Sequence, residues 1–301
     1  MDSEYDVVVV GAGPGGYVAA IRAGQLGMKT AIIEREALGG VCLNWGCIPS
    51  KALLKNAEVL SYIHRAKEFG FSFDGFHADY SVAVERSRKV VDRNVRGVTY
   101  LLRKNGVDHI EGTGTLIGAD TVEVAPEGKR LKAKSIMLAT GARPRSLPSL
   151  PIDSDRVITS RESIVMSNLP KSIVIVGGGA IGVEFAYIYS TYGVDVTVVE
   201  YLPRLIPNED EEISSQLERS FARQKINVMT GTGVTEVDVK SEGVSVKVEK
   251  DGVEQSLDCE KVLVAVGVQP NSDALGVEGL GIETQNGYIQ IDDTMRTSTP
   301  Q

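Results

Sequence analysis

Two cysteines five positions apart are the residues of this chain best suited to redox chemistry. Cys42 and Cys47 follow the glycine pair at 39–40. In a regular helix such residues are offset by about 140° and by a rise of about 7.5 Å. A disulfide needs Cα atoms closer than about 7 Å, so a bridge requires a distorted helix start, which Gly46 and Pro49 favour. A strained pair suits reversible redox chemistry, and a helix N-terminus stabilises the reactive thiolate.

Two other interpretations of this pair stay open at this point. The cysteines could be unpaired core residues, or they could bind a metal, although the sequence nearby supplies no further ligands. Cys259 stands at the entry of a predicted strand and is interpreted as structural. Three cysteines are too few for a secreted disulfide scaffold. The sequence therefore favours the cytoplasm, or a compartment like it such as the mitochondrial matrix if a targeting segment was removed.

A pattern of strand, glycine turn, helix and strand occurs twice along the chain. The first copy runs from Val7 to Ile33 and the second from Ser172 to Val199, and each is followed by a glutamate, Glu34 or Glu200. The same 166 positions separate Gly11 from Gly177, Gly16 from Gly182 and Glu34 from Glu200. The turns have the form Gly-x-Gly-x-x-Gly, with the glycines Gly11, Gly13, Gly16, Gly177, Gly179 and Gly182.

This glycine spacing is typical of dinucleotide binding. The first glycine permits the tight turn, the second lets the backbone approach a pyrophosphate, and the third lets helix and strand pack closely. Glu34 and Glu200 stand where a carboxylate accepts hydrogen bonds from ribose hydroxyls, and Glu200 would repel a 2′-phosphate. We therefore expect NAD rather than NADP at the second site. The alternative is that either glycine run is only a tight turn.

The later segments of the two copies also correspond. Each copy ends in Ala-x-Gly-x-x-Pro, at 139–144 and 265–270, and a strand–turn–strand pattern precedes each ending. The second of these patterns joins 244–248 to 262–266 through Asp251-Gly252. The predicted fold class is α/β, with two Rossmann-like dinucleotide-binding domains, each with a three-layer sheet and a small antiparallel β-meander. The predicted domains are residues 1–147 with a helical insert, 148–269, and a return segment at 270–301.

The helical insert contains an amphipathic segment at 81–104. It places Val84, Val91, Val95, Val98 and Leu102 on one face, and its charged residues are interpreted as the solvated face.

Composition excludes several classes of function. The net charge is −8, which argues against binding a nucleic-acid backbone. No window approaches the roughly twenty apolar residues of a membrane span, and the N-terminus lacks the pattern of a signal peptide. Two dinucleotide sites suggest an electron relay in which a flavin lies between NAD and another redox group. We expect neither nucleic acid nor membrane as a partner, and no metal site.

The segment from Leu38 to Leu54 resembles the redox-active segment of the pyridine nucleotide-disulfide oxidoreductases, and most closely that of the dihydrolipoamide dehydrogenases. The resemblance implies that Cys47 lies against FAD and that Cys42 exchanges with the dithiol of dihydrolipoamide, as a redox disulfide. It implies that Lys51 lies near the flavin and pairs with Glu184. It adds contacts to FAD from Gly40, Gly114, Thr140, Gly141 and Ala142, and contacts to NAD from Val234 and Gly267.

The resemblance also implies an activity and partners. Dihydrolipoamide would be oxidised through the cysteine pair and FAD, and NAD+ would be reduced. The lipoyl groups would belong to 2-oxo acid dehydrogenase or glycine-cleavage complexes, and the full-length protein would be a homodimer. The family continues beyond the segment that ends at Gln301 into a dimerisation domain with a catalytic His-Glu pair. We therefore expect this chain to be poorly active alone. Another disulfide or metal-ion reductase, or a non-catalytic FAD- and NAD-binding fragment, remains the alternative.

Overall fold

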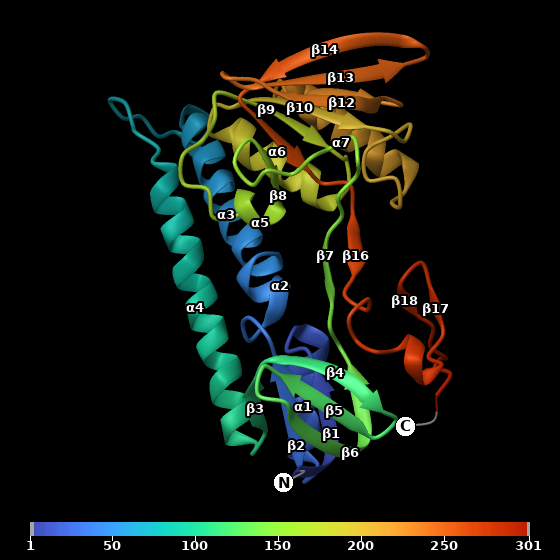
Figure 1. Cartoon of the computed structure of the whole chain (residues 1–301). Helices are drawn as coiled ribbons and strands as arrows, with labels where there is room; N and C mark the ends of the chain where they lie inside the picture. The colour runs from blue at the N-terminus through green and yellow to red at the C-terminus, as the bar shows by residue number, and fades with distance from the viewer. Residues whose placement is uncertain (1–2, 300–301) are drawn as a thin grey trace. The chain divides into compact units, whose positions relative to one another are not determined.

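The computed structural model describes residues 3–299 and divides the chain into two compact units, each built from more than one segment. Unit 1 contains residues 1–47, 90–143 and 268–301, and unit 2 contains residues 48–89 and 144–267. Figure 1 shows the elements in chain order. No helix among residues 3–299 is long and apolar enough to cross a membrane.

Unit 1 is built on a six-stranded sheet with the order β3-β2-β1-β6-β5-β4. Strands β3, β2 and β1 are parallel, with β3 at the edge of the sheet. Strand β6 runs parallel to β1 and antiparallel to β5. Helix α1 connects β1 to β2 and packs on both strands. The bounds are β1 Ser3–Val10, α1 Pro14–Gln25, β2 Thr30–Glu34, β3 Asp108–Glu111, β4 Thr113–Gly118, β5 Thr121–Ala125 and β6 Lys129–Leu138.

Unit 2 repeats this plan with a five-stranded parallel sheet and a separate three-stranded antiparallel sheet. The orders are β11-β10-β9-β15-β8 and β12-β13-β14. Helix α6 connects β9 to β10 and packs on both. The bounds are β8 Val157–Thr159, α5 Ser160–Ser163, β9 Ser172–Val176, α6 Ala180–Thr191, β10 Asp195–Glu200, α7 Glu211–Arg223, β11 Asn227–Thr230, β12 Gly233–Val239, β13 Val244–Lys250, β14 Val253–Cys259 and β15 Lys261–Val264.

The remaining elements are helices of the insert and short strands at the chain crossings. Strands β7 and β16 pair with each other, and β17 pairs with β18. The bounds are α2 Gly40–Asn44, α3 Cys47–His64, η1 Ala66–Phe69, α4 Tyr80–Lys104, β7 Ala142–Pro144, β16 Val268–Pro270, η2 Glu278–Leu280, β17 Thr284–Gln285 and β18 Tyr288–Ile289.

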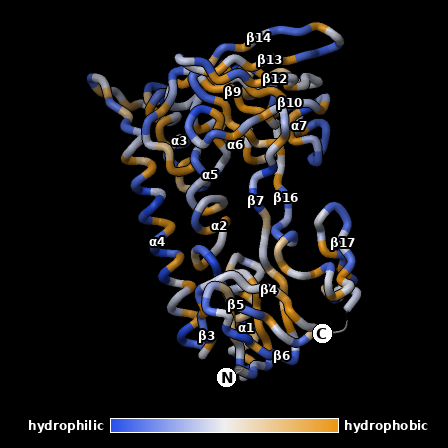
Figure 2. Tube along the Cα trace, viewed as in Figure 1, coloured by the Kyte–Doolittle hydropathy of each residue, from blue (hydrophilic) through white to orange (hydrophobic). Residues whose placement is uncertain are grey.

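Each unit has its own apolar core, because β-branched residues alternate toward one face of each sheet. The returning segment after β16 contributes Leu275, Val277 and Ile282 to the core of unit 1. The core of unit 2 lies between β9, β10 and β15 and the three-stranded sheet. In Figure 2 the central strands are correspondingly orange, whereas α4 alternates between blue and orange along its length.

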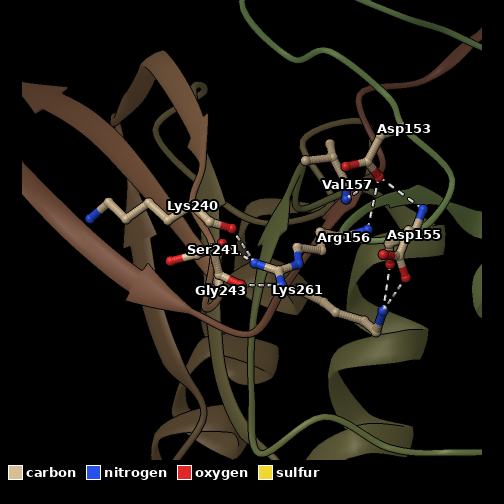
Figure 3. A network of polar contacts seen from close by, with 8 residues as sticks. All are labelled: Asp153, Asp155, Arg156, Val157, Lys240, Ser241, Gly243 and Lys261. Carbon is tan, nitrogen blue, oxygen red and sulfur yellow. Dashed lines mark hydrogen bonds and ion pairs between the residues drawn. The ribbon is translucent and has the colours of Figure 1, made fainter.

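One arginine anchors the hairpin turn between β12 and β13 (Figure 3). The Arg156 guanidinium donates to the carbonyl oxygens of Lys240, Ser241 and Gly243, at 2.6 Å for Ser241 and 3.0 Å for Gly243. The loop that carries Arg156 is fixed by Asp153, whose Oδ1 accepts three backbone N–H groups at 2.8 to 2.9 Å. Although partial burial raises the pKa of Asp153, these N–H groups outweigh it and lower that pKa.

The predicted fold class is confirmed, whereas the hairpin predicted at 244–266 is wrong in one respect. Strand β13 pairs with β14, and the next strand, β15, joins the parallel sheet beside β9. In unit 1 the single strand β6 makes both kinds of pairing. Strand β14 ends before Glu260. The N–H of Glu260 donates to Ser172, the first residue of β9, and this contact directs the following residues into the parallel sheet as β15. The domain boundaries predicted at 147 and 269 stay a prediction.

Candidate active site

The first glycine turn is held by backbone contacts that leave no room for a side chain at its first and third glycines. Gly11 has a φ of +99°, and a Cβ there would lie 2.3 Å from the carbonyl oxygen of Ala139. A Cβ on Gly16 would lie 1.8 Å from the carbonyl oxygen of Gly11. Around Gly13, in contrast, the space is open. The first and third glycines thus serve packing, and the middle one leaves the backbone accessible.

The carboxylate of Glu34 is fixed next to this turn. Its Oε2 accepts the N–H of Ala12 at 2.8 Å, and its Oε1 accepts the N–H of Glu36 at 2.9 Å. Two directed N–H groups hold the side chain in one orientation while its outer lone pairs stay available. This is the geometry required of a carboxylate that accepts hydrogen bonds from ribose hydroxyls.

A cavity of about 70 Å³ in unit 1 adjoins Glu34. Its lining includes several residues that we predicted from the sequence as FAD contacts, although these residues lie far apart along the chain. A Cβ on Gly114 would lie 3.0 to 3.3 Å from three apolar side chains, so only glycine fits there without a shift. The lining includes Gly11, Glu34, Gly114, Thr140, Asn271 and Asp273.

The second glycine turn repeats the first closely. Gly177 has a φ of +111°, and a Cβ on Gly182 would lie 1.9 Å from the carbonyl oxygen of Gly177. Glu200 accepts the N–H of Gly178 at 2.6 Å and the N–H of Leu202 at 2.7 Å. Its side chain is buried, with 8% exposure, and the space around Gly179 is open.

The helices that follow the two turns have N-terminal N–H groups that no side chain caps, which is the kind of site that binds phosphate. The N-cap residues of α1 and α6 are Gly13 and Gly179, so neither helix has a side-chain cap, and neither has an acidic residue in its first turn. By comparison, α5 is capped by Thr159 and α7 by Asp210. Uncapped N–H groups at a positive dipole end suit a pyrophosphate, so both turns fit the dinucleotides expected of them.

The two cysteines lie on different helices rather than on one distorted helix. Cys42, half-buried, belongs to α2, and Cys47, exposed, begins α3. Asn44 fixes the preceding loop, since its Nδ2 donates to the carbonyls of Leu38 at 2.9 Å and Gly40 at 3.0 Å. The break between the helices removes the helical offset that would keep the cysteines apart.

Gly40 connects the cysteine segment to the first glycine turn. A Cβ on Gly40 would lie 2.7 Å from the Cα of Gly13, and the N–H of Gly39 donates to the carbonyl of Ala12 at 2.8 Å. The glycine pair therefore lets the cysteine segment pass against the backbone of the turn. In unit 1 this places α2 beside the expected pyrophosphate site.

Lys51 and Glu184, both in unit 2, form the pair that the resemblance implies. Lys51 Nζ donates to Glu184 Oε1 at 2.6 Å, and the two side chains are 62% and 25% exposed. Lys51 lies about one helical turn after the start of α3. Glu184 lies on α6, within the first turns after the second glycine motif.

The other expected contact residues lie at strand ends. Val234 is on β12, next to a register shift between Val234 and Glu236. Gly267 has a φ of +99° and its carbonyl accepts the N–H of Arg145 at 3.0 Å. Gly141 has a φ of +65°, and Ala142 begins β7. A positive φ at both glycines turns the chain where it leaves a sheet.

Sequence reasoning missed the long-range contacts of Asn271 and Asp273, both of which line the cavity of unit 1. Asn271 Nδ2 donates to the carbonyl of Thr140 at 3.0 Å, and its N–H donates to the carbonyl of Gly141 at 3.0 Å. Arg143 donates to both carboxylate oxygens of Asp273, at 3.2 and 2.9 Å. The Arg143 guanidinium, through its hydrogen bond, lowers the pKa of Asp273. No local pattern predicts a contact across about 130 positions.

Cys259, unlike Cys42 and Cys47, is a buried cysteine outside the candidate site. Its thiol is buried and donates to the carbonyl of Val244 at 3.7 Å, and burial raises the pKa of Cys259 to about 11. Among residues 3–299 no group of three or more His, Cys, Asp and Glu side chains is arranged to hold a metal ion.

The comparisons with known proteins agree with this geometry. Residues 5–301 match the family described as pyridine nucleotide-disulphide oxidoreductase. The chain belongs to this family. A dihydrolipoyl dehydrogenase of Chlorobaculum tepidum is 45% identical over 99% of the chain and 64% of the relative. One of Mycobacterium leprae is 47% identical over 98% of the chain and 65% of the relative. The chain thus spans slightly less than two thirds of the length of these two family members.

Two solved structures have the same fold as this chain. The crystal structure of LpdA from Mycobacterium tuberculosis aligns with a TM-score of 0.88 and 29% identity, over 98% of this chain and 65% of that one. The HOCl-induced flavoprotein disulfide reductase RclA from Escherichia coli aligns with a TM-score of 0.84 and 26% identity, over 98% and 64%.

Proposed function

We propose that this chain forms the FAD- and NAD-binding part of a dihydrolipoyl dehydrogenase, in which Cys42 and Cys47 carry electrons from dihydrolipoamide. The observation that carries the proposal is the duplicated turn. Ala12 N–H binds Glu34 and Gly178 N–H binds Glu200, with open glycines and uncapped helices in both copies. Two dinucleotide sites with a cysteine pair beside one of them are what a relay from a dithiol to NAD+ requires.

The thiol steps balance as two exchanges. One substrate thiolate attacks Cys42 Sγ of the Cys42–Cys47 disulfide, and Cys47 leaves as a thiolate. The second substrate thiol then attacks the mixed disulfide, which releases cyclic lipoamide and reduced Cys42. Re-formation of the Cys42–Cys47 disulfide would release two electrons, for which bound FAD would supply the acceptor chemistry on the way to NAD+. The Lys51–Glu184 ion pair would hold a positive charge at a fixed place near the flavin.

The second site is proposed to select NAD. Glu200 is held by two N–H groups in a buried setting, so it cannot swing away from a 2′-phosphate. A buried carboxylate that faces a phosphate is repulsive, whereas a ribose hydroxyl donates to it. We expect NADH to bind at least about tenfold more tightly than NADPH, which corresponds to about 1.4 kcal/mol.

Anaerobic visible spectroscopy tests the relay. The chain is reconstituted with FAD and titrated with dihydrolipoamide, and a long-wavelength band from thiolate-to-flavin charge transfer is expected. Cys42→Ser should keep a band that arises from the Cys47 thiolate, and Cys47→Ser should abolish it. If the chain binds FAD but its visible spectrum does not change when the dithiol or NADH is added, the result would support the non-catalytic alternative.

A second candidate is another disulfide or metal-ion reductase of the family, because RclA aligns over nearly the whole chain. Substrate comparison on the full-length protein separates the two. NAD+ reduction by dihydrolipoamide supports the first proposal. NADH oxidation by glutathione disulfide or by Cu(II), without turnover of dihydrolipoamide, supports the second. The proposed partners are lipoyl groups of 2-oxo acid dehydrogenase or glycine-cleavage complexes, and the proposed assembly is a homodimer in the cytoplasm or a similar compartment.

A further inference from the structure

Helix α4 carries seven basic and two acidic residues in a chain whose net charge is −8. Its apolar residues form the buried face, with Val84, Val91, Val98 and Leu102 between 2% and 6% exposed. The cations are therefore concentrated on one element against the overall acidity of the protein. Figure 2 shows the hydrophilic segments spaced along this helix.

The exposed face opposite the apolar one is a continuous basic stripe. We define the α4 stripe as Lys89, Arg93, Arg96, Tyr100 and Arg103, which are exposed and spaced by four, three, four and three positions. Such spacing places all five on one side of the helix, over a length of about 21 Å. Tyr100 lies within the stripe and is 53% exposed.

Three of the four cations in the stripe lack the counter-charge that a cation on a solvated helix face normally has. Lys89 Nζ lies 4.0 Å from Glu85. Arg93, Arg96 and Arg103 form no ion pair with any residue between 3 and 299. Like charges three and four positions apart repel one another and destabilise the helix. An anionic surface laid along the helix would remove this repulsion.

We infer that the α4 stripe is a docking surface for a folded protein domain that presents a row of carboxylates. Arginine and tyrosine are the residues that protein interfaces favour, because the planar guanidinium binds carboxylates with two N–H groups and the ring adds apolar contact. A long nucleic-acid backbone would extend beyond the 21 Å stripe over an acidic protein, which repels it, whereas a small acidic domain contacts the stripe alone.

The test uses the full chain and a fluorescent poly-L-glutamate peptide as the probe, with binding measured by anisotropy at low and high salt. The stripe variant is Arg93→Gln/Arg96→Gln/Arg103→Gln. The matched control removes the same charge from exposed positions elsewhere, as Lys67→Gln/Lys129→Gln/Lys225→Gln. We expect the stripe variant to bind at least about tenfold more weakly and the control to change less than about twofold. Binding should also weaken with salt.

Several results would overturn the inference. Equal affinity of the two variants would show that only net charge matters, and tighter binding of duplex DNA than of poly-L-glutamate would assign the stripe to nucleic acid. Sedimentation that shows self-association lost only in the stripe variant would assign it to a second copy of the chain. If the triple variant does not fold, two single variants replace it. Arg96→Gln should weaken binding, and Arg96→Glu should weaken it further. Oxidation of free dihydrolipoamide does not require the α4 stripe. Failure of that reaction would therefore contradict the proposed function and not the docking surface.

Discussion

At the scale of single residues, the three cysteines show how environment decides chemistry. Cys259 is buried on β14 and its pKa is raised to about 11 by burial, whereas Cys47 is exposed. Iodoacetamide at pH 8 is therefore expected to modify Cys47 in the reduced chain and to spare Cys259. Mass spectrometry of the digested protein checks this. Modification of Cys259 at a rate similar to Cys47 would mean that β14 opens readily.

The same thiol predicts a change of stability with pH. Its folded pKa of about 11 lies above the ordinary value of 9.0, so folding favours the neutral thiol. The contribution is fully present below about pH 9, and it is lost as the pH rises through 11 because the unfolded chain ionises first. Between these pH values the wild type should lose about 2–3 kcal/mol of unfolding free energy relative to Cys259→Val. Urea unfolding of both proteins at pH 8 and pH 11 measures the difference, and parallel pH profiles would contradict it.

Glu200 is expected to matter for stability as well as for the cofactor. Glu200→Ala removes the acceptor of two N–H groups in a buried setting. The unsatisfied donors should lower the free energy of unfolding by about 1–3 kcal/mol. Glu249→Ala, on an exposed position of β13, is the matched control and should have almost no effect. If urea unfolding shows no difference between the two variants, the N–H groups must find other acceptors.

At the scale of elements, the glycines of each turn divide into two kinds that can be separated by alanine. A Cβ on Gly182 would lie 1.9 Å from the carbonyl of Gly177, whereas the space around Gly179 is open. Gly182→Ala should therefore destabilise the protein by about 2–4 kcal/mol, despite the higher helix propensity of alanine.

Gly179→Ala should leave stability nearly unchanged and weaken NADH binding, because its Cβ occupies the approach to the helix N-terminus. Thermal unfolding and NADH titration of both variants separate the two roles. Normal NADH affinity in Gly179→Ala would mean that the pyrophosphate lies elsewhere.

The elements of the two repeats could be predicted because local patterns define them. The strand–turn–helix–strand pattern predicted from Ser172 to Val199 forms β9, α6 and β10, and the amphipathic segment at 81–104 forms α4. Strand pairing is a different kind of information. Glu260 ends β14 through contacts with Ser172, about ninety positions away, and nothing near 260 in the sequence predicts that partner.

The candidate site shows the same limit. The glycines, Glu34 and Glu200 were predicted from spacing, since a turn and the strand end after it are local. Asn271 was not predicted, because it contacts Thr140 and Gly141 only after the chain has passed through residues 144–267 of unit 2. The roles assigned to Cys42, Cys47 and the other site residues stay predictions until the spectra are recorded.

At the scale of the whole molecule, the two units each contain one complete glycine turn with its glutamate. Glu34 and Ala12 belong to unit 1, and Glu200 and Gly178 belong to unit 2. Each unit also has its own apolar core. The two cofactors should therefore stabilise different parts of the chain.

A ligand that binds only the folded protein stabilises it by about 2.7 kcal/mol at one hundred times its Kd. We expect NADH to protect the wild type and Glu34→Ala against urea but not Glu200→Ala. FAD should protect the wild type and Glu200→Ala but not Glu34→Ala. Because two units need not unfold together, the transitions should be followed by flavin fluorescence and by circular dichroism in parallel. Loss of both protections in Glu34→Ala would show instead that unit 2 folds only when unit 1 holds its cofactor.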